Sequence, residues 1–159
     1  SERIIEIATV VTNADLEEIK EGPNLVIKQP QEYIDSMDEW NINQHTSSGL
    51  IESMKATQIS IEEAENQTLE FLRKHTKKGK SPLCGNSISH DRRFLVRYMP
   101  ELADFFHYRN IDVSSVKELV KRWKPKLTDG IDKNGNHRAM ADVYESIKEL
   151  KFYKENLFN

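Results

Sequence analysis

An apolar, β-branched run near the start of the sequence constrains the fold more than any other feature. Residues 4–12 read Ile-Ile-Glu-Ile-Ala-Thr-Val-Val-Thr and are followed by Asn-Ala-Asp, which is typical of a strand that enters a turn. Residues 25–28, Leu-Val-Ile-Lys before Gln-Pro, supply a hairpin partner. Segments of helical and strand character alternate after this hairpin, so we predict an α/β domain with a mixed sheet.

Helix signals divide the rest of the chain. Ser60 and Glu63 form a capping box at the start of a helix that we expect to run to about His75. A second helix is expected over 91–99 and should end at Pro100. A third should begin after Ser114, which would be its N-cap residue, and a fourth should begin at about residue 138. We predict short helices and loop over 33–50, and a loop over 128–136. Strands are expected over 82–85, where the strand should be buried, and over 108–113.

Length, charge and cysteine content exclude several classes of protein. The 159 residues, 31% charged, predict a single domain over 1–159, with no membrane span and no secretory signal in the sequence as given. A net charge of −3 disfavours a protein that binds long nucleic acid through many phosphates, but it is compatible with a partner that carries few phosphates. Cys84 is the lone cysteine and has no partner for an internal disulfide. We therefore expect a reducing compartment, the cytoplasm or, in a eukaryote, the mitochondrion.

Two aspartates and one histidine are the candidates for chemistry. Asp91 and Asp142 each lie near the start of a predicted helix, and His137 lies in the loop before the last one. Considered one at a time, Asp91 is most simply a helix cap, Asp142 a solvated carboxylate and His137 a surface imidazole. Taken together, two carboxylates can bind Mg²⁺ and a neighbouring imidazole can deprotonate a water molecule. Two-metal phosphodiester cleavage uses these groups, usually with more carboxylates than two.

Several longer motifs extend this interpretation to a family. The segments 81–95, 107–114, 122–125 and 137–142 closely resemble those of oligoribonucleases, and the resemblance runs from Arg3 to Phe158. Oligoribonucleases are DEDDh 3′-to-5′ exonucleases. The resemblance implies a ribonuclease H-like fold, in which helices flank a mixed central sheet. It also implies a homodimer that uses two Mg²⁺ or Mn²⁺ ions to degrade very short RNA, down to dinucleotides, into mononucleotides.

The resemblance also assigns roles to individual residues. It implies that Asp91 and Asp142 bind metal and that His137 is the general base. It implies that the 5′-terminal phosphate is bound by Ser87, Arg109 and Ser114, and that the pocket of the 3′ nucleotide is lined by Trp40 and His45. It also implies that Tyr108 reaches into the site of the partner subunit. Without the resemblance, the plain readings are core packing for Trp40, strand packing for Tyr108 and helix capping for Ser114.

One departure from the family concerns the metal site. The family carries Asp-x-Glu on a strand just before the segment that matches residues 3–6, and this sequence begins at Ser1 without it. Glu6 does not replace that motif, because it lies on the following strand and no Asp stands two places before it. The chain is therefore expected to be either a clipped form of a normal enzyme, which the otherwise intact motifs favour, or a fragment without catalysis.

Two other functions stay open at this point. One is a DEDDh exonuclease that acts on longer RNA or on DNA 3′ ends. The other is a non-catalytic, dimeric module that binds small nucleotides, which the missing acidic pair favours. Cleavage rates on substrates of different length separate the first from an oligoribonuclease, and binding without cleavage in Mn²⁺ identifies the second.

Overall fold

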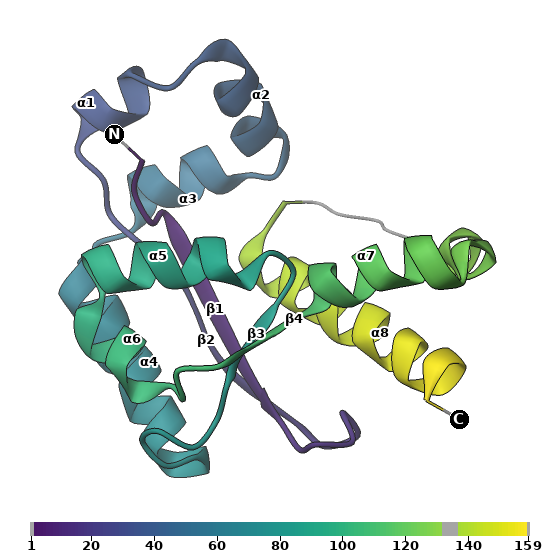
Figure 1. Ribbon diagram of the computed structural model, residues 1–159. Helices are drawn as coiled ribbons and strands as arrows, with labels where there is room; N and C mark the ends of the chain where they lie inside the picture. Colours follow the sequence, from purple (N-terminus) through teal and green to yellow (C-terminus); the bar gives the residue numbers. More distant parts are fainter. Residues whose placement is uncertain (1, 132–136, 159) are drawn as a thin grey trace.

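A computed structural model describes residues 2–131 and 137–158 of the chain (Figure 1). It has the predicted α/β character, with the helices distributed around short strands. The elements in chain order are β1 (Glu6–Thr12), β2 (Ile19–Val26), α1 (Gln31–Asp35), α2 (Glu39–Ser47), α3 (Leu50–Ala56), α4 (Ile61–His75), β3 (Leu83–Gly85), α5 (Ile88–Tyr98), α6 (Pro100–Phe105), β4 (Asn110–Asp112), α7 (Val113–Trp123), a 3₁₀ helix (Pro125–Gly130) and α8 (Ala139–Leu157).

The strands form two separate pairs. β1 and β2 make an antiparallel hairpin, in register from Glu6 opposite Val26 to Thr12 opposite Ile19, with an irregularity between Ala8 and Val10. The hairpin was predicted, but its second strand is Ile19–Val26 and overlaps the predicted 25–28 only at Leu25 and Val26. β3 and β4 pair in parallel. Among the described residues no ladder joins the two pairs, so the structure has two two-stranded sheets where the sequence predicted one mixed central sheet. Both pairs contact α8, which passes along β1 and β3.

Three apolar clusters hold the elements together. The largest lies between the hairpin and helices α4, α5 and α6, where Ile27, Leu72 and Met99 are almost fully buried. A second joins α1 and α3 through Leu50 and Met54. The third packs α7 on α8, and its members are Val113, Val120 and Tyr153. Burial of such aliphatic and aromatic side chains is the main stabilising contribution, about 1.5–3 kcal/mol for each one.

The helices predicted from caps and periodicity are confirmed, with local corrections. α4 begins after the Ser60 cap and ends at His75, and α8 follows Arg138. Pro100 ends α5 as predicted, but it also opens α6, because proline is compatible with the first turn of a helix. The 3₁₀ helix occupies the start of the predicted 128–136 loop, of which residues 132–136 lie outside the described part of the chain.

Two predictions about the short strands are wrong. The predicted strand over 108–113 is only Asn110–Asp112, because Asp112 turns the chain and caps α7 by accepting a hydrogen bond from the Ser114 amide. Ser114 therefore lies inside α7 and is not its cap. The strand that contains Cys84 was expected to be buried, yet this thiol-bearing residue is exposed. No helix in the described ranges is long and apolar enough to cross a membrane.

Candidate active site

Helices α5 and α8 present the two candidate aspartates in equivalent places. Ser87 is the N-cap residue of α5, and Asp91 follows it by four positions. Arg138 is the N-cap residue of α8, and Asp142 again follows by four positions. Each carboxylate therefore lies at the end of the first helical turn, where the helix dipole favours negative charge. The structure brings together the pair that the sequence selected.

The electrostatics of this pair show that its charges are poorly compensated. Burial raises the pKa of Asp91, the nearby His90 opposes this shift, and the Asp142 carboxylate adds a smaller increase. Burial also raises the pKa of Asp142, with contributions from the Glu145 and Glu6 carboxylates. Partly buried carboxylates whose pKa is raised by a neighbouring carboxylate are more frequent at functional sites than elsewhere.

His137 lies near Asp142 at the entrance of α8. It is exposed, immediately precedes the N-cap residue of α8, and has a left-handed backbone with φ of 59°. Its positive charge lowers the pKa of Asp142 and that of His45, so it lies within electrostatic reach of both. A non-glycine residue in this backbone region is uncommon and costs roughly 1 kcal/mol or more, a strain that often accompanies a functional position.

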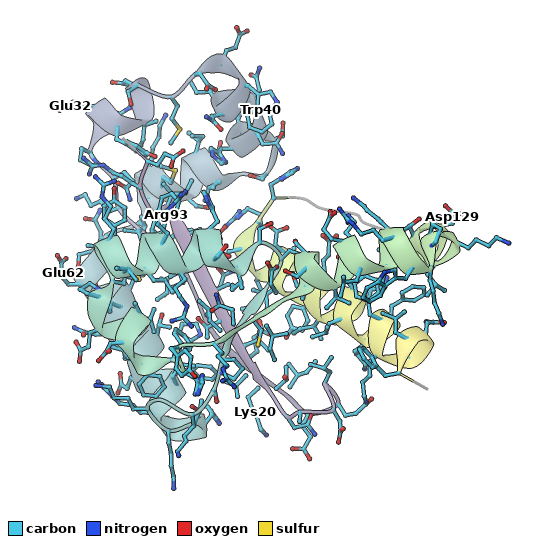
Figure 2. The ribbon with its side chains drawn as sticks, in the orientation of Figure 1. Lys20, Glu32, Trp40, Glu62, Arg93 and Asp129 are labelled. Atoms are coloured by element: carbon cyan, nitrogen blue, oxygen red, sulfur yellow. The ribbon has the colours of Figure 1, made fainter. Side chains whose placement is uncertain are left out.

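Helix α2 carries both His45 and Trp40. The Nδ1 atom of His45 is buried and finds no hydrogen-bond partner within the described residues. Burial lowers the pKa of His45, as does His137, while Glu6 opposes this effect. A buried polar atom without a partner calls for an explanation, and a bound ligand is one. Trp40 is 68% exposed (Figure 2), so its plain reading as a core residue is wrong.

A hydrogen-bond network joins Ser87 to Ser114. The Ser87 amide donates to Asp112 Oδ1 and to Ser114 Oγ, both at 3.0 Å, and the two serine hydroxyls lie 3.3 Å apart. The Ser114 hydroxyl donates to Asn86 Oδ1 at 3.0 Å, and Asn86 Nδ2 donates to Ser146 of α8 at 2.9 Å. Two of the three residues assigned to the 5′ phosphate are thus adjacent, with hydroxyl groups on one surface.

Arg109, the third of these residues, lies on the other side of β4. It precedes the strand, whereas Ser114 follows it. Its guanidinium lies over the Tyr108 ring, 5.3 Å from the centroid, and among the described contacts it makes no hydrogen bond to either serine. Tyr108 stacks on His107 and is 73% exposed, so it is not packed within the sheet. Arg109 and Tyr108 therefore form one exposed unit, apart from the serines of the same chain.

Three residues that the sequence interpretation did not assign to the site support it. Arg138 pairs with Glu6 of β1, and Asn86 connects Ser114 to α8. One sequence signal for Glu6 existed: it is the lone charge within an otherwise apolar and threonine-containing run over residues 4–12. A charge inside a strand of this kind is usually paired in the fold.

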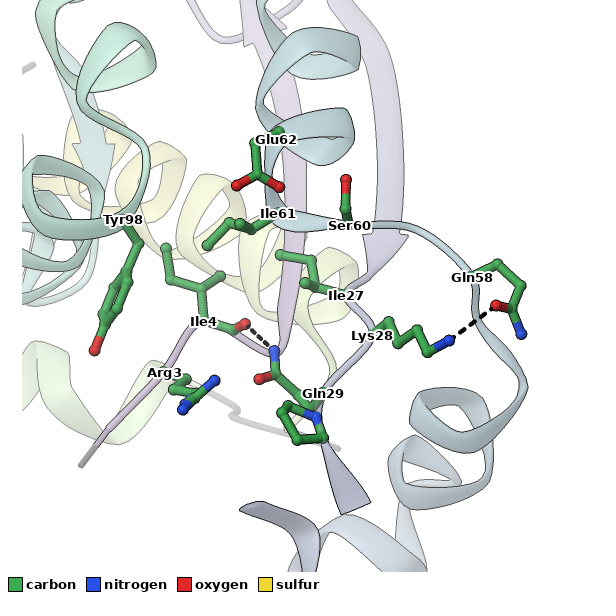
Figure 3. A pocket seen from close by; sticks show the side chains of 11 residues that line it. Arg3, Ile4, Ile27, Lys28, Gln29, Gln58, Ser60, Ile61, Glu62 and Tyr98 are labelled. Carbon is green, nitrogen blue, oxygen red and sulfur yellow. Dashed lines mark hydrogen bonds between the residues drawn. The ribbon is translucent and has the colours of Figure 1, made fainter. Parts of the chain in front are cut away.

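A pocket of about 450 Å³ lies elsewhere, where the segment before β1 meets the start of α4 (Figure 3). Arg3, Lys28, Glu62 and Tyr98 are among its lining residues, and Gln29 donates to the Ile4 carbonyl at 2.9 Å inside it. None of the predicted site residues lines this pocket. The candidate active site is therefore defined by the convergence of α2, α5 and α8 rather than by the pocket.

Comparison with known proteins agrees with this geometry. A family described as exonuclease, of the RNase T type, matches residues 1–150. An oligoribonuclease of Bordetella pertussis is 57% identical over 156 residues, covering 98% of this chain and 86% of that protein. Oligoribonucleases of Thiobacillus denitrificans and Nitrosomonas europaea are 56% and 53% identical and are covered over 86% and 88% of their lengths.

The chain belongs to this exonuclease family, which matches residues 1–150. Within that family it is an oligoribonuclease, since the identity extends over nearly the whole chain.

Proposed function

We propose that this oligoribonuclease degrades very short RNA, including dinucleotides, from the 3′ end to 5′-mononucleotides, with His137 as the general base. The observation that carries the proposal is the meeting of Asp91, Asp142 and His137 at the starts of α5 and α8. Family membership gives the reaction class, and these groups are the ones that such hydrolysis requires.

Asp91 and Asp142 fit a divalent metal site. Their carboxylate oxygens are the donors that Mg²⁺ and Mn²⁺ prefer, and their raised pKa values indicate negative charge that a cation would neutralise. When bound, two ions would polarise the scissile phosphate and lower the pKa of the attacking water. In the described ranges no cluster of three or more acidic, histidine or cysteine side chains suits a metal. We propose that further oxygen ligands complete the site in the active enzyme, and calorimetric titration with Mn²⁺ tests whether the purified protein binds the ions.

His137 is the residue that we expect to move the proton. Its imidazole takes a proton from the water whose oxygen attacks the phosphorus atom. The bond between phosphorus and the 3′ oxygen of the preceding nucleotide breaks, and that oxygen is protonated by solvent. The 3′ nucleotide then leaves with a 5′ phosphate. The exposure of His137 allows the proton to return to solvent before the next cycle.

The two ends of a short substrate would meet different groups. The Ser87 and Ser114 hydroxyls, 3.3 Å apart, support a site for the 5′ phosphate. The His45 Nδ1, which has no partner among the described residues, supports a site for the 3′ nucleotide, to which Trp40 of the same helix would contribute. We propose that Arg109 completes the phosphate site, because a guanidinium binds a phosphate through two parallel hydrogen bonds. Arg109→Ala should weaken binding of 5′-phosphorylated dinucleotides far more than of unphosphorylated ones; equal losses would refute this role.

A homodimer would bring Arg109 of one copy to Ser87 and Ser114 of the other copy. Arg109 and Tyr108 are exposed and in contact, and Ile111, Leu119 and Trp123 are also exposed, the last of these by 73%. Leu119 and Trp123 are four residues apart on α7 and share a face, and contiguous exposed apolar side chains mark interaction sites. We propose that this face contacts a second copy of the chain. Trp123→Glu should yield monomers in sedimentation velocity, and an unchanged dimer would contradict the proposal.

The His137→Ala variant tests the proposed reaction directly. We expect turnover of a dinucleotide in Mn²⁺ to fall by about 10²–10⁴-fold, because proton transfer to a positioned base is lost, while dinucleotide binding stays near wild type. A near-normal rate would show that His137 is not the base. Wild-type rates on two-, five- and twenty-nucleotide RNA complete the test. Preference for the longest substrate would indicate a broader exonuclease, and binding without cleavage would indicate a non-catalytic module.

A further inference from the structure

Arg138 connects three elements of the site through one side chain. Its Nε donates to Glu6 Oε1 at 3.1 Å and to Oε2 at 3.2 Å, and its Nη2 donates to Oε2 at 2.9 Å. Its Nη1 donates to the Ser48 carbonyl at 3.0 Å. Glu6 belongs to β1, Ser48 is the C-cap residue of α2, and Arg138 itself is the N-cap residue of α8. One guanidinium therefore fixes a strand and two helix ends relative to each other.

Glu6 is committed to this arrangement. Its side chain is only 5% exposed, and its Oε1 also accepts from the Ala139 amide at 3.0 Å. Ala139 is the first residue of α8, whose own N-cap residue makes no side-chain capping hydrogen bond in the described structure. The carboxylate of β1 therefore caps α8 from outside the helix, where the helix dipole favours it. Loss of Arg138 would leave the buried Glu6 carboxylate without this charge partner.

The residues held by this ion pair are neighbours of the proposed catalytic groups. His137 precedes Arg138 directly, in the strained left-handed conformation, and His45 lies three residues before Ser48. Gly49 follows with φ of +78°, so the chain turns sharply just beyond the Ser48 carbonyl that Arg138 binds. A displacement of Arg138 would therefore move the imidazoles of both α2 and the α8 entrance. Misplacement of reacting groups by about 1 Å can cost roughly 100-fold in rate.

We propose that Arg138 and Glu6 form a positioning clamp that sets His137 and His45 in register with the two aspartates. This inference rests on the proposed function, since it assigns a role toward the same site. Arg138 is a positioning residue here, not a catalytic one. Lysine would not replace it fully, because an ammonium is a point charge, whereas the guanidinium fork binds the Glu6 carboxylate and the Ser48 carbonyl simultaneously.

Arg138→Lys and Arg138→Met in the full-length protein test the clamp. We expect kcat on a dinucleotide to fall by about 100-fold for Met and about tenfold for Lys, which keeps the charge but loses the fork. Arg73→Met is the matched control, since Arg73 pairs with Glu101 at 3.2 Å on the exposed surface between α4 and α6. This control should keep the wild-type kcat, and thermal unfolding should show each variant folded at the assay temperature.

Imidazole NMR shifts supply a readout that needs no catalysis. In Arg138→Lys, the signals of His137 and His45 should move, while those of His75 at the end of α4 should not. Unchanged His137 and His45 signals together with a wild-type kcat would overturn the clamp, as would a loss of stability alone. If the wild-type protein itself fails to cleave, the proposed function fails, and the NMR shifts still decide whether Arg138 positions these two imidazoles.

Discussion

The starts of α5 and α8 have similar backbone geometry but are stabilised by different interactions. Both helices follow a residue with left-handed backbone, Ser87 with φ of 50° and His137 with φ of 59°, and both carry an aspartate four positions after the N-cap residue. The start of α5 is fixed mainly by neutral hydrogen bonds among Asn86, Ser87 and Ser114, with one carboxylate acceptor at Asp112. The start of α8 is fixed by the Glu6–Arg138 ion pair.

This difference between the two helix starts matches the role that we propose for each of them. Around α5, the Ser87 and Ser114 hydroxyls can donate hydrogen bonds to a phosphate, while the Ser87 and Ser114 amides hold the Asp112 carboxylate. At α8, the ion pair is internally neutralised and buried, so it orders His137 without adding net charge. Two helix starts with the same geometry can therefore bind metal with their aspartates and still serve separate groups of a nucleotide.

Replacing each aspartate by asparagine tests whether the two helix starts form one site. Asp91→Asn and Asp142→Asn should each reduce dinucleotide turnover by about 1,000-fold, because metal catalysis supplies several kcal/mol of transition-state stabilisation. The losses should be similar in size when kcat is measured in Mn²⁺. A rate close to wild type for Asp142→Asn alone would show that Asp142 is a surface carboxylate and would break the equivalence.

Removing the amide of Asn86 tests the neutral network specifically. Asn86→Ala deletes the acceptor of the Ser114 hydroxyl and the donor to Ser146, so it should cost about 1–3 kcal/mol in the free energy of unfolding by urea. The matched control is Asn156→Ala, whose exposed side chain bonds only the Phe152 carbonyl of its own helix. That variant should stay within about 0.5 kcal/mol of wild type. Equal effects would mean that the α5 network carries no special role.

The local elements could be predicted from the sequence because their signals are local. The capping box at Ser60 and the β-branched hairpin rest on contacts between near neighbours, and α4 and β1 appear where expected. Asp91, Asp142 and His137 were selected as two carboxylates near helix starts and a loop imidazole, and the resemblance to a family then assigned their roles. The Glu6–Arg138 pair joins residues 132 positions apart, and no local pattern encodes such a contact. The separation of the sheets depends likewise on which strands pair, a tertiary property.

The stability of the asparagine variants offers the smallest expected effect. The folded protein raises the pKa of Asp91 and Asp142 above their values in the unfolded chain, so it binds protons more tightly there. The stability gained from this is complete below the usual aspartate pKa and is lost as the pH rises through the raised pKa. At neutral pH without divalent ions, each ionised carboxylate therefore destabilises the fold, and asparagine should raise Tm by about 1–3 °C.

Two controls make this small shift interpretable. Asp129→Asn, on the exposed 3₁₀ helix (Figure 2), should leave Tm unchanged. The advantage of Asp91→Asn and Asp142→Asn should vanish near pH 3, where the wild-type carboxyls are protonated as well. Added Mn²⁺ should reverse the order, because an ion that binds only the folded wild-type site stabilises it by mass action. A lower Tm for both variants at neutral pH would mean that these carboxylates stabilise the fold. It would contradict the prediction that the two ionised aspartates destabilise the metal-free protein.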